Sequence, residues 1–440
     1  MTHYDLLIRG AEVLDPSAGI AGQQDLAVRN GRVAAIEPAI APEMARIVID
    51  AGGQYLLPGL VDLHTHIYPE ATFWGIDPAE VAWRTGVTTW VDAGSAGAYN
   101  FRGLRQRSGS CPVRCSAFIN ISAIGLTAPT GELRHLDLCD PAMCEQIAGA
   151  AGSFVAGVKV RIDRRNVGPH GTEPLRRALG AARALAKPLM VHIGDGPPAL
   201  ADVLQPLAEG DIVTHCTTPG NMGLLDHRGA LKPCVRAALD RGVVFDVGHG
   251  YGAFSFRVAE AIVNTAGLPH VISTDIHQLS IRGPMFDLPT CMSKFLAVGM
   301  SLADVVLATT AVPAQVLGLA DEIGSLQVGR PADLGLFQLT TGEFTLYDVD
   351  LSARVADRLL QNTLTLVGGV PLAAAAAEPP PPWVERTAAE TRVESGLMSA
   401  LRQPRAARLG SASGFMPRLA RSAGRPAGGS GAGQGAGDEH

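Results

Sequence analysis

Residues 57–66, with the sequence LPGLVDLHTH, decide the fold class and the chemistry that we predict for this chain. The apolar, β-forming residues before the histidines predict a strand, and side chains along a strand alternate between two faces. Asp62, His64 and His66 therefore share one face. Two imidazoles at one strand end can bind a divalent cation, because neutral imidazole is a good ligand for zinc and its neighbours. Two solvated histidines would give the same local pattern, so the rest of the chain has to decide.

Composition bounds the class of protein. The chain has 440 residues, 47% of them hydrophobic and 18% charged, which is enough for a large α/β domain and a smaller one. A net charge of −6 and a pI near 6.1 offer no basic surface for nucleic acid. No apolar run reaches the roughly 18 residues that suggest a membrane span. We therefore expect neither nucleic acid nor a membrane as a partner.

Cysteine usage and the first residues indicate the compartment. Seven cysteines lie at positions 111, 115, 139, 144, 216, 234 and 291, and no pair has the Cys-x2-Cys spacing of a zinc site. A scattered, odd set in a long chain indicates reduced thiols and not a disulfide framework. The sequence MTHYD at the start lacks the charged-then-apolar pattern of a secretory signal. We therefore predict a cytoplasmic protein.

Strand-like and helix-like stretches alternate between residues 56 and 324, which is typical of parallel βα units. Helical stretches such as 173–186 and 230–241 separate eight strand candidates, at 57–66, 87–93, 113–121, 156–162, 188–193, 211–216, 243–248 and 270–277. Eight units predict an α/β fold of the (β/α)8 TIM-barrel type, with catalytic groups at the carboxyl ends of the strands. The alternative, an open doubly wound sheet, lacks a glycine-rich phosphate loop after its first strand.

The two ends of the chain carry short strand-like runs separated by turns. One set lies in residues 1–55 and a partner set in 325–371, and neither closes a core alone. We predict one small β-sandwich-like domain formed from both ends. Residues 372–440 are rich in alanine, proline, glycine and arginine, which predicts a low-complexity, mostly disordered tail with a short helix near 384–402.

Residues of metal-ligand type occur on five of the predicted strands. A lysine inside an apolar strand is costly to bury, because its charge must be paired or neutralised. A single histidine on a strand is usually a core residue, but this many ligand-type residues in matching places are hard to attribute to chance. They are His64 and His66 on the first strand, Lys159 on the fourth, His192 on the fifth, His215 on the sixth and Asp275 on the eighth.

This pattern resembles the amidohydrolase superfamily over residues 1 to about 370, and the stretch GRPADL at 329–334 matches as well. The resemblance implies two divalent ions, which we expect to be zinc. Lys159 would be carboxylated by CO2 and bridge them; an unmodified Lys159 paired with a carboxylate is the alternative. The remaining ligands implied for the two ions are His64, His66 and Asp275 for the first, and His192 and His215 for the second.

Such a centre has a plain chemical use. Carboxylation turns a costly buried ammonium into a bridging anion, and two divalent ions can share a hydroxide and lower its pKa towards neutrality. One ion can also polarise the scissile carbonyl group. Asp275 can take the proton from the attacking hydroxide and pass it to the leaving group.

Within the superfamily, the chain resembles the dihydroorotase-like amidohydrolase/deacetylase subgroup. True dihydroorotases usually place an arginine two residues after the second histidine of the first strand, where this chain has Tyr68. The resemblance therefore implies removal of an acyl group, commonly acetyl, from an N-acyl amino acid or an O-acyl hydroxy acid. The stretches that carry it are DAGSAGA at 92–98, GVKVR at 157–161, VHIG at 191–194, THC at 214–216, DVGHG at 246–250 and STDIH at 273–277.

Two other functions stay open at this point. One is a cyclic-amide hydrolase of the dihydroorotase or hydantoinase type. The other is a non-catalytic metabolite-binding barrel, against which the complete set of six ligand-type residues argues. In each case the partner is a small molecule, and the sequence is compatible with a homo-oligomer.

Contacts to the substrate are less defined. Arg161 shares the strand parity of Lys159, so it should face the barrel interior and could hold a substrate carboxylate, or else an ion pair that closes the barrel. Arg282 and Gly283 lie in a segment, 280–285, that either offers backbone amides to the substrate or is a plain loop. Large apolar side chains in the loops after strands one, two and eight should enclose the substrate; they are Tyr68, Phe73, Trp74, Tyr99, Phe101, Met285 and Phe286.

Overall fold

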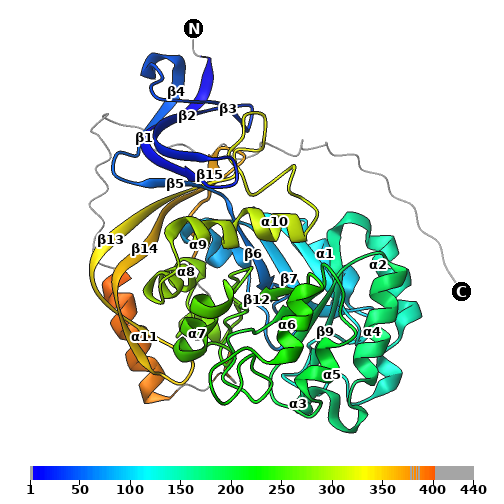
Figure 1. The fold of residues 1–440 in the computed structure, drawn as a ribbon. Coiled ribbons are helices and arrows are strands. Elements are labelled where there is room, and N and C mark those ends of the chain that lie inside the picture. The colour runs from blue at the N-terminus through cyan, green and yellow to red at the C-terminus, as the bar shows by residue number, and fades with distance from the viewer. Residues whose placement is uncertain (1–2, 377–378, 380, 383, 385–386, 402–440) are drawn as a thin grey trace, which may run out of the picture. The chain divides into compact units, whose positions relative to one another are not determined.

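The computed structural model describes residues 3–376, 379, 381, 382, 384 and 387–401 (Figure 1). Two sheets contain its strands, one of them parallel and the other mixed. Within the described residues, no helix is both long enough and apolar enough to cross a membrane.

The parallel sheet has seven strands in sequential order, and each hydrogen-bonds to the next. It curls into a half-barrel of the TIM-barrel type (Figure 1). Its strands are β6 (Leu60–Thr65), β7 (Val87–Gly97), β8 (Arg114–Asn120), β9 (Val155–Ile162), β10 (Leu189–Ile193), β11 (Ile212–Thr214) and β12 (Val244–Asp246). All residues of β6 and β7 are buried, as expected for a parallel sheet that is covered on both faces.

The eighth predicted strand, 270–277, does not form a regular ladder, so that part of the prediction was wrong. The segment lies between β12 and β6 and touches each through one isolated parallel bridge, Asp246 to Val271 and Thr65 to Ile276. The backbone N–H of Asp275 donates to the carbonyl of His64 at 2.7 Å. Asp275 itself has φ +49°, outside the β region, and this interrupts the strand geometry. The segment therefore fills the gap without continuous pairing.

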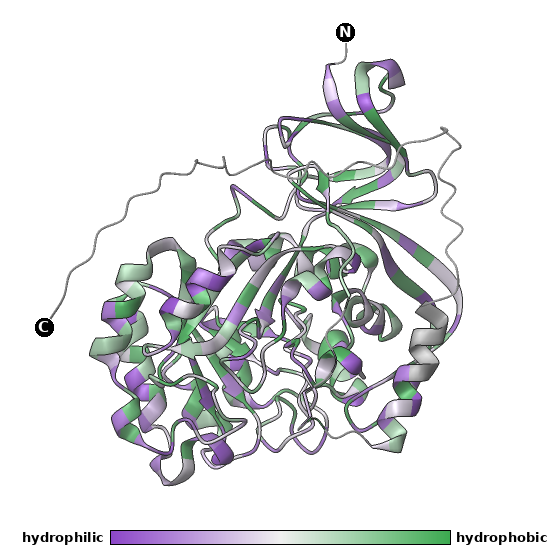
Figure 2. Ribbon diagram, turned by 180° about the vertical axis from the view of Figure 1, so that it is seen from behind, coloured by the Kyte–Doolittle hydropathy of each residue, from purple (hydrophilic) through white to green (hydrophobic). Residues whose placement is uncertain are grey.

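Helices pack their apolar faces on the sheet, and Figure 2 shows apolar and polar residues mixed along the helices in view. In α4 the buried Leu175, Ala178 and Ala182 recur at the spacing of one helix face. The helices are α1 (Phe101–Ser108), α2 (Pro141–Ala151), α3 (Arg164–Val167), α4 (Glu173–Ala184), α5 (Leu200–Leu204), α6 (Pro233–Asp240), α7 (Phe256–Ala266), α8 (Leu288–Ala297), α9 (Leu302–Thr309) and α10 (Ala311–Val316).

Both ends of the chain contribute to the mixed sheet, as the sequence predicts. Its order is β15-β14-β13-β5-β1-β2-β3, with β4 paired to β1. Buried Leu6, Leu26, Leu56, Leu334 and Leu366 share one core cluster, so the two ends form one apolar core. The sandwich-like arrangement stays a prediction. The strands are β1 (Tyr4–Asp15), β2 (Ile20–Arg29), β3 (Arg32–Glu37), β4 (Ala45–Asp50), β5 (Tyr55–Pro58), β13 (Leu334–Tyr347), β14 (Ala353–Val367) and β15 (Val370–Pro371).

Gly59 is the single residue between the two sheets on the way into the histidine strand. Its N–H donates to the carbonyl of Asp333 at 2.8 Å, and the next N–H, of Leu60, donates to Gly86 at 2.9 Å. A Cβ atom at position 59 would overlap the Thr88 side chain. Glycine is therefore needed here because the backbone passes close to β7, and this passage fixes where β6 begins.

The short helix predicted near 384–402 is present as α11 (Ala388–Leu401). The disorder predicted for the tail falls mostly on residues 402–440, which lie outside the described residues. The predicted domain boundaries stay predictions.

Candidate metal centre

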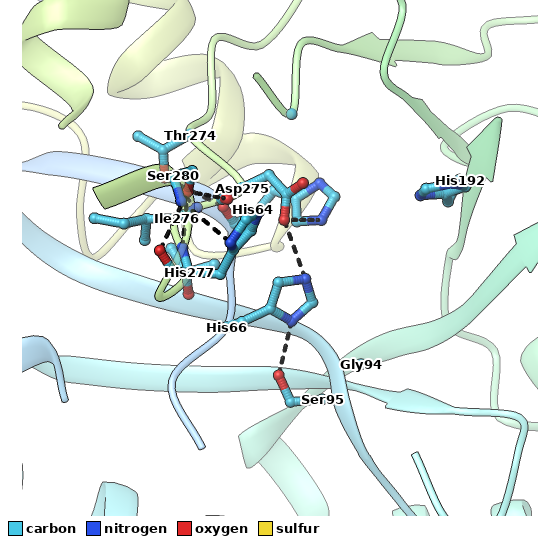
Figure 3. A network of polar contacts seen from close by, with 12 residues as sticks. His64, His66, Gly94, Ser95, His192, Thr274, Asp275, Ile276, His277 and Ser280 are labelled. Atoms are coloured by element: carbon cyan, nitrogen blue, oxygen red, sulfur yellow. Dashed lines mark hydrogen bonds and ion pairs between the residues drawn. The ribbon is translucent and has the colours of Figure 1, made fainter. Parts of the chain in front are cut away.

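His64, His66 and Asp275 meet at the end of β6. One ligand-type atom from each lies within 4.8 Å of the other two. Oδ1 of Asp275 is 3.1 Å from Nε2 of His66 and 3.4 Å from Nε2 of His64, and Figure 3 shows the three side chains converging. Among the residues that the structure describes, this buried oxygen has no hydrogen-bond partner. Burial raises the pKa of Asp275, but the neighbouring His64 and His66 outweigh it and lower that pKa well below its usual value.

Thr214 sets the tautomer of His64. The Thr214 hydroxyl donates to Oδ2 of Asp246 at 2.7 Å, so its oxygen is left to accept from Nδ1 of His64 at 2.8 Å. Nδ1 therefore carries the proton, and the lone pair of Nε2 points towards Asp275. Carboxylates that fix a metal-binding histidine in this indirect way are common around metal sites.

His66 is oriented by β7. Its Nδ1 lies 2.7 Å from Oγ of Ser95, as the dashed contact in Figure 3 shows. The backbone N–H of Ser95 in turn donates to Oδ1 of Asp92 at 2.7 Å. The buried Asp92 therefore positions Ser95, and Ser95 in turn orients the ring of His66.

His192 and His215 form a second pair, at the ends of β10 and β11. Nε2 of His192 donates to Oδ2 of Asp163 at 3.0 Å, and Nδ1 of His215 donates to the carbonyl of Gly248 at 2.7 Å. The other nitrogens, Nδ1 of His192 and Nε2 of His215, lie 2.7 Å apart. With the outer nitrogens protonated, two lone pairs face each other, an arrangement that a shared cation or proton stabilises.

Lys159, on β9, lies beside His64. It is 1% exposed, and its Nζ is 3.3 Å from Nε2 of His64 and 3.2 Å from Sδ of Met190. Burial lowers the pKa of Lys159 to about 7, so a large share of the amine is neutral at neutral pH. Gly94, at φ +85°, makes room for it, since a Cβ there would lie 2.6 Å from Cβ of Lys159.

These residues fit divalent ions. The lone pairs of four imidazoles and a carboxylate oxygen without a donor converge on one buried space. Nitrogen and oxygen donors of this kind suit zinc and its neighbours. The structure thus brings together all six predicted ligand-type residues.

A cavity of about 430 Å³ opens above the six residues, and all of them line it. Arg161 lines it as well, but Nε and Nη2 of Arg161 bind Oε1 and Oε2 of Glu132, each at 2.6 Å. Of the two roles expected for Arg161, a contact to a substrate carboxylate or an ion pair within the barrel, the structure shows the ion pair. Arg282 and Gly283 are not among the described residues that line the cavity.

The apolar side chains expected around the substrate lie mostly elsewhere. Trp74 lines the cavity and packs edge-on against His277, with ring centroids 4.7 Å apart. Phe101 and Met285 are core residues, and Tyr99 is 64% exposed. The hydroxyl of Tyr68 donates to the carbonyl of Asn100 at 3.2 Å, and Tyr68 is not among the described lining residues.

Several residues that orient the ligands were missed by the sequence reasoning. The position of Asp163 could have been predicted, because it follows Lys159 and Arg161 at a spacing of two residues and so shares their face of the strand. The position of Thr214 could not, since it precedes His215 directly and would face the opposite side of a regular strand. His215 leaves the strand with φ +76°, which lets neighbouring residues face one space. Lys294 was also missed: it is fully buried in α8, and its Nζ lies 2.7 Å from Nε2 of His249 and 2.8 Å from the carbonyl of Pro284.

Comparison with known proteins gives a consistent result. The sequence model of the Amidohydrolase family matches residues 55–367. A deacetylase of Agrobacterium fabrum is 37% identical over 352 residues, which are 79% of this chain and 86% of that protein. The crystal structure of an adenine deaminase superposes with a TM-score of 0.77 at 32% identity, covering 84% of this chain and 99% of that one. The crystal structure of a dihydroorotase gives 0.76 at 33% identity, with the same shares covered.

These relatives differ in the activities for which they are named, but the family is shared by all of them. The match spans the whole half-barrel and every one of the six ligand-type residues. The chain therefore belongs to the amidohydrolase family and is a hydrolase that acts on carbon–nitrogen bonds.

Proposed function

We propose that the protein is a binuclear metal-dependent deacylase, which removes an acyl group, most often acetyl, from an N-acyl amino acid or an O-acyl hydroxy acid. The observation that carries this proposal is the convergence of two histidine pairs, Lys159 and Asp275 on the floor of one cavity. The 37% identity to a deacetylase over most of both chains supports the reaction class.

In this proposal, His64, His66 and Asp275 hold one divalent ion, and His192 and His215 hold the other. When bound, such ions lower the pKa of a water molecule and polarise a carbonyl group, and zinc suits the donor set. Lys159 carries a carboxylate derived from CO2: the neutral amine forms a nitrogen–carbon bond with CO2 and loses one proton. Its lowered pKa supports this, because only the neutral amine has the lone pair that attacks CO2.

Asp275 is the proposed proton carrier. It lines the cavity beside His64 and His66, and its Oδ1 is 3.1 Å from Nε2 of His66. We propose that Asp275 accepts a proton from the attacking water and gives it to the leaving amine or alkoxide, a task worth about 10²–10⁴ in rate. Gly250 leaves space for its second oxygen, since a Cβ there would overlap Oδ2 of Asp275.

A cyclic-amide hydrolase is the second candidate, because a dihydroorotase structure superposes closely. The position of Tyr68 argues against dihydroorotate as the substrate. Its hydroxyl is bound to a backbone carbonyl, and it offers no cation to grip a carboxylate. We therefore place the cyclic amides second.

One experiment separates these functions. Protein purified without chelators is analysed for metal and assayed on N-acetyl-D- and N-acetyl-L-amino acids, O-acetyl hydroxy acids and dihydroorotate. We expect about two divalent ions per chain and turnover of an acetylated acid. Metal content near zero with activity that survives chelation would refute the mechanism, and turnover of dihydroorotate alone would favour the second candidate.

A further inference from the structure

Arg165 presents an unpaired cation to the cavity. It lies in α3, directly after β9, and lines the cavity together with Arg161. Its guanidinium makes no hydrogen bond or ion pair with any residue that the structure describes. Of the two lining arginines, Arg161 has Nε and Nη2 held by Glu132, so Arg165 is the one whose whole planar donor face is available.

The backbone of Arg165 is fixed even though its side chain is not. Its N–H donates to Oδ1 of Asp163 at 2.8 Å, and its carbonyl accepts from Nε of Arg134 at 3.0 Å. The other oxygen of Asp163 accepts from Nε2 of His192 at 3.0 Å. One carboxylate therefore orients a metal-binding histidine and also anchors the residue that carries the free guanidinium.

Asp163 is itself rigid. Its two oxygens also accept from the backbone and side-chain amides of Asn166, at 3.1 and 2.7 Å. Burial raises the pKa of Asp163, but the hydrogen bonds from His192 and Asn166 outweigh it and hold the pKa below its usual range. The distance between the histidine pair and the start of the Arg165 side chain is thus set by short, fixed contacts.

The charges around the cavity suggest what Arg165 binds. The carboxylates that line it are Asp163, Asp195 and Asp275. Asp163 is saturated and Asp275 faces the histidines. Asp195 is held less tightly: its Oδ1 accepts from the backbone N–H of Asn221 at 3.4 Å, and its carbonyl accepts from the N–H of Arg164 at 2.8 Å. An anionic substrate would be repelled near Asp195 and attracted to Arg165, where a guanidinium can bind both oxygens of a carboxylate.

We propose that Arg165 binds the free carboxylate of the acylated acid at the mouth of the cavity, while the acyl group lies against the histidines on its floor. The proposal rests on the deacylase function proposed above. It makes Arg165 a specificity-determining residue. Binding of the substrate carboxylate, which the sequence suggested for Arg161, is thereby assigned to Arg165.

The test compares Arg165→Met with Arg164→Met. Arg164 precedes Arg165 in the same short helix and is exposed like it, but it is not among the described lining residues. Both variants and the wild type, each loaded with zinc, are assayed on an N-acetyl amino acid and on its methyl ester, which has no negative charge. Metal content is measured for each, so that a misfolded variant is recognised.

We expect Arg165→Met to lose at least about tenfold in kcat/KM on the free acid, mostly through KM, as for loss of a hydrogen-bonded charge pair. The methyl ester should change by less than about threefold, and Arg164→Met should resemble the wild type on both. Equal losses on acid and ester, or no loss on the acid, would overturn the assignment.

If the wild type hydrolyses neither compound, the proposed function fails while this inference can still be judged. The same N-acetyl amino acid is then titrated calorimetrically into the zinc-loaded proteins. Binding that weakens about tenfold in Arg165→Met supports the carboxylate site. Binding that is absent from the wild type, or unaffected by the substitution, overturns it.

Discussion

Thr214→Val tests how far the proposed metal centre depends on residues that would not touch the metal. Valine has nearly the shape of threonine but neither donates nor accepts a hydrogen bond. The change removes both contacts of the Thr214 hydroxyl, at 2.8 Å to Nδ1 of His64 and at 2.7 Å to Oδ2 of Asp246. It leaves a buried N–H and a buried carboxylate oxygen without this partner.

The size of the effect follows from these two contacts. Each buried polar group that loses its partner costs about 1–3 kcal/mol. Asp246 Oδ2 lies only 3.6 Å from Nδ1 of His64, so a small shift can join them directly and recover part of the loss. We expect the free energy of unfolding of the metal-free protein to fall by about 2 kcal/mol. Metal affinity should fall by about 10–100-fold, because His64 no longer has one fixed tautomer.

Zinc affinity is measured by competition with a chromophoric chelator, and stability by urea unfolding of the metal-free protein. Thr309→Val is the matched control. The Thr309 hydroxyl is buried and, among the described residues, bonds to the carbonyls of Val305 and Val306 in its own helix and to no other group. If Thr214→Val keeps zinc within about threefold of the wild type while the control behaves as expected, Thr214 does not set the state of His64.

Three further predictions concern charged residues inside the protein. Lys159→Ala should lose metal and activity, with partial rescue by a short carboxylic acid that supplies the missing bridge; retention of both ions and full rate would exclude the carboxylated lysine. Asp275→Asn should fold normally but lose about 10²–10⁴ in kcat, because an amide cannot carry the proton; a rate within about tenfold of the wild type would remove that role. Burial lowers the pKa of Lys294 from 10.5 to about 8, so between pH 8 and 10 the unfolded chain binds more protons than the folded one. The free energy of unfolding of the wild type should therefore rise over this range relative to Lys294→Met, and parallel pH profiles would contradict the assignment.

The fold was predictable where one periodicity dominates. Seven of the eight expected strands are present, because long apolar runs bounded by turns leave few alternatives to a buried parallel strand. The eighth was predicted wrongly for a local reason: the sequence STDIH at 273–277 is typical of a strand, but Asp275 adopts a positive φ. The alternation of apolar and polar residues does not reveal that a single residue, here Asp275, departs from the strand conformation.

The candidate site was predictable to the extent that its residues lie at strand ends. Because side chains alternate along a strand, the sequence places Lys159 and Arg161 on the same face, and both line the cavity. The alternation could not show that Arg161 forms an ion pair with Glu132. Glu132 comes from the loop after β8, and loop conformations leave little trace in a sequence pattern. The position of Arg165 at the cavity was not predicted for a similar reason. Arg165 lies in a short helix after the strand, where the alternation of side chains along a strand no longer applies.

The way in which β5 is paired has a consequence for the synthesis of this protein. β5 lies one residue before the strand of His64 and His66, and its partner β13 includes Leu336, which pairs with Leu56. At ordinary translation rates, the interval between making these two strands is on the order of tens of seconds. During that time the edge of β5 that pairs with β13 has no hydrogen-bonding partner, and the apolar side chains of β5 are not covered by β13. A nascent chain of this protein should therefore attract chaperones until residues near 340 have emerged. A premature stop codon before β13 should damage the proposed metal centre even though all six of its ligand-type residues have been synthesised.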